Sequence, residues 1–213
     1  ACPLVHLSAE PPKGALHEAI GVETNIPVIA TTPPYTGSFN VFADPDGTVR
    51  RMPLVVRYQD RLFPSLALQV LAVALADLPL LIKLDQHGVL DVRLGAVSIP
   101  VNNKGDLLLN YYGPAYTFPY YSATTLLHRE APAGCLQGKL VVVGNTTVGL
   151  HDMRPTPFST VFPGVELHCT VMENILQQQF MTRSDRSAPF HDLAALITLA
   201  GVFLVLQMLV SHG

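Results

Sequence analysis

The order of apolar and polar positions first predicts a hairpin-like pair of strands. Residues 38–42 and 48–58 are rich in strand-forming side chains. Between them, residues 44–47 read Asp-Pro-Asp-Gly, an order typical of a type I turn. Further short strands are predicted within 81–112, around a turn rich in asparagine and glycine.

Helical patterns follow in three places. Pro64 and Ser65 open an almost wholly apolar stretch that ends at Asp77. It is too short to span a membrane, so we predict a fully buried helix. Residues 122–129 predict a short helix.

Residues 163–180 predict a longer helix with one apolar face. The residues expected to pack on the sheet recur at steps of three and four, and they are Val165, Cys169, Met172, Leu176 and Phe180. The polar residues on the rest of the helix are Glu166, Thr170, Glu173 and Gln177.

Residues 139–144, which read Lys-Leu-Val-Val-Val-Gly, carry the clearest strand pattern in the chain. Four consecutive apolar residues before a glycine are typical of a strand buried on both faces, as in a parallel sheet. The predicted fold class is therefore α/β: a layered sheet with a buried parallel strand and flanking helices, followed by a C-terminal transmembrane helix.

The transmembrane prediction rests on residues 193–210, whose only polar members are Thr198 and Gln207. An uncharged and almost wholly apolar run of eighteen residues makes a candidate membrane span. A buried core helix is the alternative, but such a helix is seldom apolar all round. Arg183 and Arg186 precede the run, and charge alone leaves its orientation open. No signal peptide is predicted, and both ends are expected to be cuts in a longer chain.

Composition narrows the functional classes. Only 14% of residues are charged, against the usual ~25%, and the net charge is −3. This composition excludes a basic nucleic-acid binder and a disordered chain. Three cysteines without a Cys-x-x-Cys pair predict neither a zinc site nor a disulfide framework. We predict no cofactor and no metal.

The first block of candidate chemistry is the predicted turn. Asp44, Asp46 and Gly47 match the first half of a calcium loop, but Val55 stands where the loop needs an acidic residue. We expect Asp46 to pair with one of the arginines at 50 and 51 instead.

The second block follows the predicted strand at 139–144. Its Val-Gly-Asn-Thr-Thr-Val-Gly-Leu sequence lacks the Lys-Ser/Thr pair of a phosphate-binding loop. His151 and Asp152 lie in a loop where α/β folds often bind ligands. They could serve acid–base or metal chemistry, or only structure the loop.

The order of motifs resembles the CHASE type 2 family of extracellular sensory domains. FNVFADPDGTVRRMPL is followed by FPSLALQ, LLLNYYGP, LQGKLVVVGNTTVGLHDMRPTP and FPGVELHCTVMENIL, and then by the apolar run. The resemblance covers residues 37–210. It implies an incomplete N-terminal part at 1–36, a sensory domain at 37–189 and a transmembrane helix at 190–213.

The resemblance implies that this chain is the signal-input module of a bacterial membrane receptor and is itself not an enzyme. The domain would lie outside the cytoplasm, sense an unidentified small molecule or physical cue, and signal through the bilayer. The output would be a cytoplasmic nucleotide cyclase, diguanylate cyclase or kinase. Because such outputs usually work as dimers, we expect this module to form a homodimer. Two alternatives are a membrane-anchored hydrolase using residues 145–152 and an inert interaction domain.

No catalytic residue is assigned from the sequence. The candidate ligand-binding residues come from the two blocks, which we expect to meet near one end of the sheet. They are Asn40, Asp46, Arg50 and Arg51 in the first block, and Asn145, His151 and Asp152 in the second.

Overall fold

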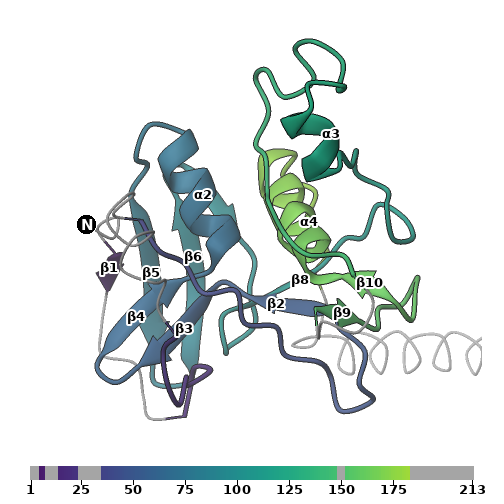
Figure 1. The fold of residues 1–213 in the computed structure, drawn as a ribbon. Coiled ribbons are helices and arrows are strands. Elements are labelled where there is room, and N and C mark those ends of the chain that lie inside the picture. The colour runs from purple at the N-terminus through teal and green to yellow at the C-terminus, as the bar shows by residue number, and fades with distance from the viewer. Residues whose placement is uncertain (1–4, 8–13, 24–34, 148–151, 183–213) are drawn as a thin grey trace, which may run out of the picture. The chain divides into compact units, whose positions relative to one another are not determined.

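The computed structural model describes residues 5–7, 14–23, 35–147 and 152–182 (Figure 1). The strands are β1 (Val5–Leu7), β2 (Arg51–Pro53), β3 (Val55–Tyr58), β4 (Arg61–Pro64), β5 (Leu80–Asp85), β6 (Gly88–Leu94), β7 (Val97–Ile99), β8 (Asp106–Leu108), β9 (Met153–Arg154) and β10 (Phe162–Pro163). The helices are α2 (Leu66–Ala74), α3 (Ala123–Leu127) and α4 (Gly164–Leu176). The mixed α/β class is confirmed.

The largest sheet has the strand order β1-β5-β6-β7. β1 runs parallel to β5, and the other two pairs are antiparallel. Every second residue of β5 is buried, as expected for a strand with one face on the core. The register shifts after Lys83, so that Leu90 of β6 is an extra, exposed residue between Val89 and Asp91.

Helix α2 begins where the sequence predicts. The Ser65 hydroxyl accepts a hydrogen bond from the Leu68 backbone N–H at 3.3 Å, which caps the helix. The helix packs beside α4 (Figure 1). The prediction of a fully buried helix was wrong, because Val73 in its last turn and the C-cap residue Leu75 are exposed. One hydrophobic core joins α2, α4 and the largest sheet.

The apolar face predicted for α4 was partly wrong. Met172 is buried, but Val165 and Cys169 are only half-buried and Leu176 is exposed. The core-facing residues are instead Leu167, Val171 and Ile175. The polar residues Glu166, Thr170 and Asn174 are also buried, because a second segment of the chain covers that side of the helix.

The prediction that residues 38–42 and 48–58 form a hairpin-like pair of strands was also wrong. Residues 48–58 form two strands, since β2 pairs with β8 and β3 pairs with β4. Between them, the Leu54 N–H donates to Gly105 O and the Leu54 carbonyl accepts from Ser65 N, which joins the two pairs. Residues 38–42 form no strand; only Ser38 makes a bridge, with Ser65.

The prediction of a buried parallel strand at 139–144 was wrong as well. These residues form no strand, and Val141 and Val143 are 51% and 90% exposed. A strand requires a partner for its backbone groups, and no described strand pairs with this segment. Among the strands that the structure describes, the parallel pair is β1 with β5.

The chain divides into two compact units, Ala1–Met181 and Thr182–Gly213. The predicted membrane span at 193–210 lies outside the described residues. Within 5–7, 14–23, 35–147 and 152–182, no helix is long and apolar enough to cross a membrane.

Candidate functional site

The turn at 44–47 forms as predicted and shapes the first block. The Gly47 N–H donates to Asp44 O at 2.8 Å, and the Asp44 N–H donates to Thr48 O at 2.9 Å. Gly47 has a φ of +81°, a conformation that favours glycine. The Asp46 carboxylate accepts from the Thr48 N–H at 3.0 Å, a local contact that fixes this side chain within the turn.

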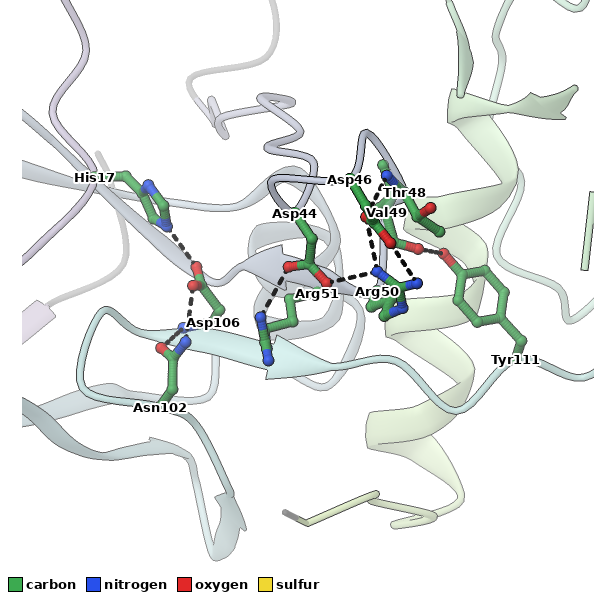
Figure 2. A network of polar contacts seen from close by, with 10 residues as sticks. All are labelled: His17, Asp44, Asp46, Thr48, Val49, Arg50, Arg51, Asn102, Asp106 and Tyr111. Carbon is green, nitrogen blue, oxygen red and sulfur yellow. Dashed lines mark hydrogen bonds and ion pairs between the residues drawn. The ribbon is translucent and has the colours of Figure 1, made fainter. Parts of the chain in front are cut away.

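Two arginines bind these aspartates (Figure 2). Arg50 donates to both carboxylate oxygens of Asp46, at 2.9 and 2.8 Å, and to Asp44 at 3.0 Å. Arg51 donates to the other oxygen of Asp44 at 2.8 Å. The predicted pairing of Asp46 with an arginine is confirmed. Hydrogen bonding from Arg50 holds the pKa of Asp46 below its usual range.

The arginine and aspartate charges of this network pair with one another, which limits their availability to a ligand. Both carboxylates accept guanidinium donors in charge-assisted bonds, so each positive charge already has a negative partner. Asn40 lies outside this network, and its described side-chain contact is with the Ser38 hydroxyl at 2.8 Å. Ligand binding by these residues stays a prediction.

The second block is also held by local contacts. The Asn145 side chain accepts from the Thr147 N–H at 2.7 Å, forming a turn. The Asp152 carbonyl accepts from Gly164 N at 2.7 Å, and its carboxylate lies against Gly164 at the start of α4. Burial raises the pKa of Asp152, and Arg154 acts in the opposite direction. His151 lies outside the described residues.

The two blocks approach each other through the backbone. The Val49 N–H donates to Pro155 O at 2.8 Å, and the Val49 carbonyl accepts from the Tyr111 hydroxyl at 2.7 Å. In the described parts of the chain, no hydrogen bond or ion pair joins either arginine to Asp152. A single ligand site made by both blocks, and the hydrolase alternative that uses residues 145–152, remain predictions.

The sequence patterns did not predict a second network of polar contacts, which is centred on Asp106 (Figure 2). Asp106 is buried and accepts from His17 Nε2 at 2.7 Å and from the Asn102 side-chain amide at 3.0 Å. The His17 ring stacks on Phe42 with ring centroids 4.3 Å apart. His17 and Asp106 are 89 positions apart, so no local spacing could have paired them.

Helix α4 carries the most heavily bonded buried charge among the described residues. Glu166 is only 1% exposed. Its carboxylate accepts from the backbone N–H groups of Tyr116, Thr117 and Phe118 at 2.8, 2.9 and 3.3 Å. The Tyr120 hydroxyl donates to it at 3.0 Å. Four donors from one loop therefore compensate the cost of burying this carboxylate.

The same side of α4 holds the start of that loop. Asn174 accepts from the Asn110 N–H and donates to Asn110 O, both at 2.9 Å, and donates to the Tyr112 hydroxyl at 3.2 Å. Between Glu166 and Asn174, the Thr170 hydroxyl donates to the Glu166 carbonyl at 2.8 Å. The available signal was the spacing of Glu166, Thr170 and Asn174 at steps of four, but the predicted pattern placed Glu166 and Thr170 only on the rest of the helix and did not indicate what covers them.

Two other buried polar side chains have atoms without a partner in the described residues. Both amide atoms of Gln69 on α2 are unpaired, and so is Nδ1 of His168 on α4. Burial lowers the pKa of His168 to about 4. Among the described residues, no group of three or more His, Cys, Asp or Glu side chains could hold a metal ion.

The comparisons with known proteins identify the family. A model of the CHASE2 domain matches residues 6–208. The chain belongs to the CHASE2 domain family. No curated protein and no solved structure matches it.

CHASE2 is a family of extracellular sensory domains, and the chain is consistent with a sensor module. The resemblance drawn from the motif order over 37–210 is thereby confirmed. The family match begins at residue 6, so it also takes in His17 and the network around Asp106.

Proposed function

We propose that this chain is the extracytoplasmic signal-input module of a bacterial membrane receptor. Its CHASE2 membership carries the proposal, since the family consists of extracellular sensory domains. The apolar run at 193–210 supports a membrane helix after the domain. The cytoplasmic output is a nucleotide cyclase, a diguanylate cyclase or a kinase.

The contacts of α4 support a route for the signal. This helix ends at Leu176, shortly before the second unit begins at Thr182. Its Glu166 and Asn174 side chains hold the loop that contains Tyr112 and Tyr116. A cue that displaces the loop would therefore change contacts made directly by α4, and rigid helices transmit such changes along their axes.

Reporter fusions in the native reading frame test the topology. Alkaline phosphatase fused after residue 192 is expected to be active, because the enzyme folds with its disulfides only outside the cytoplasm. The same reporter fused after residue 213, beyond the apolar run, is the matched control and is expected to be inactive. An inactive reporter at 192 together with an active one at 213 would contradict the extracytoplasmic position.

A further inference from the structure

Tyrosines are concentrated in one short loop of this chain. Five of the 7 tyrosines lie within residues 111–121, which also contain Phe118; we call this segment the aromatic loop. No Asp, Glu, Lys or Arg occurs between Asp106 and Arg129. The aromatic loop is therefore an uncharged segment rich in aromatic rings and phenol hydroxyls.

Most of these rings are open to solvent, although the loop is firmly held. Tyr112, Tyr120 and Tyr121 are exposed, and Tyr116 is 55% exposed. Tyr112 packs edge-on against Phe118, and Tyr116 against Tyr120, with ring centroids 6.2 and 5.1 Å apart. These pairs fix the rings relative to one another.

The hydroxyl groups divide into two sets. Those of Tyr112 and Tyr120 are bonded to Asn174 and Glu166 of α4. Those of Tyr116 and Tyr121 have no hydrogen-bond partner among the described residues. The first set anchors the loop to the helix, and the second leaves two phenols free to bond a ligand.

Packing of the hydrophobic core does not explain why the aromatic loop is anchored to α4. The exposed tyrosines contribute no member to the hydrophobic core, yet Glu166 is buried to hold their loop. Burying a carboxylate costs several kcal/mol before its hydrogen bonds are counted. Rigid tyrosines that are ordered in advance give a recognition surface with a small entropy loss on binding.

We propose that the aromatic loop binds a neutral carbohydrate chain, with the exposed rings of Tyr116 and Tyr121 packing against C–H groups of its sugars and their free hydroxyls bonded to its oxygens. The lack of charged side chains within residues 107–128 disfavours an anionic or cationic ligand, and the carboxylate of Glu166, which contacts the loop, is already matched by four donors. This inference rests on the proposed sensory function and assigns it a ligand class.

Tyrosine fluorescence gives a direct test, because the chain contains no tryptophan. The full chain is kept in a polyoxyethylene detergent, which carries neither sugar nor ammonium groups. Cellohexaose, maltohexaose and chitohexaose are titrated to about 10 mM, which covers weak single-site binding. We expect a saturable change for at least one of them. Tyr116→Leu and Tyr121→Leu are each expected to weaken it by about tenfold or more.

Two further variants separate ring contact from other effects. Tyr116→Phe keeps the ring and is expected to lose only a few-fold in affinity, about the effect of one hydrogen bond. Tyr58→Leu removes a tyrosine outside the loop and is expected to bind normally. No saturable change with any of the sugars, or unchanged binding in both leucine variants, would overturn the inference. So would saturation by tetramethylammonium alone, which would indicate a cation-binding aromatic surface.

The results of the sugar titrations can be distinguished from the results of the reporter fusions that test the proposed function. An active fusion at residue 192 without sugar binding overturns the ligand class and leaves the sensor topology standing. Sugar binding with an inactive fusion does the reverse.

Discussion

At the scale of single residues, His168 is a buried base that the fold keeps neutral. It is 5% exposed, and Nδ1 has no partner within the described ranges. Burial lowers its pKa from 6.5 to about 4. The unfolded chain therefore binds more protons than the folded chain between these two pH values, and the folded state loses stability as pH falls from 6.5 towards 4.

Between pH 7 and pH 4.5 we expect this loss to be on the order of 2 kcal/mol, since one pKa unit corresponds to about 1.4 kcal/mol and the interval ends above the folded pKa. Urea unfolding at pH 7 and at pH 4.5 measures it in the full chain and in His168→Met. The variant should lose less stability between the two pH values than the wild type. His128→Gln, which changes an exposed histidine, should behave like the wild type. Identical pH profiles for His168→Met and the wild type would rule out this role.

Substitution of Gln69 is expected to increase stability rather than decrease it. Its amide is buried in α2, and neither of its polar atoms is paired among the described residues. Removing an unpaired buried amide is favourable, so Gln69→Leu should raise the free energy of unfolding by roughly 1 kcal/mol. Thermal unfolding measures this, with Gln86→Leu at an exposed position as the control. A large loss of stability would show that Gln69 has a bound partner.

At the scale of elements, the start of α4 depends on a close approach between backbone and side chain. A Cβ at Gly164 would overlap the carboxylate of Asp152. We expect Gly164→Ala to destabilise the fold by about 1–3 kcal/mol, because the carboxylate must move. The double variant with Asp152→Ala should recover much of this loss. Gly21→Ala has open space and is the control. Failure of the double variant to recover stability would place the strain elsewhere.

Helix α4 also depends on the hydrogen bonds between Glu166 and the aromatic loop. Glu166→Gln replaces an acceptor oxygen with an N–H group that faces the backbone donors. We expect a loss on the order of 2–4 kcal/mol, with faster hydrogen exchange at the amides of 116–118. Glu173→Gln changes a glutamate on the same helix whose described side-chain bond is to Gln177. It should leave exchange in the loop unchanged; equal effects of the two variants would exclude a specific role for Glu166.

At the scale of the whole molecule, the described part of the first unit shares one hydrophobic core. Leu16 near its start, Ile82 in the largest sheet and Ile175 near the end of α4 are all members. His17 and Asp106 add a polar contact across 89 positions. Because distant segments share one core, the unit is expected to unfold in a single transition.

The proposed receptor role predicts association at this scale. Sedimentation of the full chain in polyoxyethylene detergent should give a protein mass of two 23.0 kDa copies. Homodimers are the commonest symmetric assemblies and bring two output domains together. A concentration series serves as the control, since a specific dimer dissociates on dilution with one equilibrium constant. A mass of one copy at every concentration would contradict the homodimer.

The sequence predicted what is decided within a few residues. The turn at 44–47, the cap at Ser65 and the pairing of Asp46 with one of the arginines at 50 and 51 depend on local hydrogen bonds and backbone angles, and all three are confirmed. Motif order was sufficient to predict the CHASE2 family. These features need no knowledge of what lies across the fold.

Only the tertiary structure decided which faces are covered. Residues 139–144 have strand composition but no described partner strand, so their valines are exposed. Glu166 has a helix-surface pattern, yet it is buried by a loop 46 to 50 positions away. Burial requires a second surface, and hydrogen-bond satisfaction requires donors brought from distant segments. A pattern along the chain specifies an element, whereas the neighbours of that element are fixed only when the chain has folded.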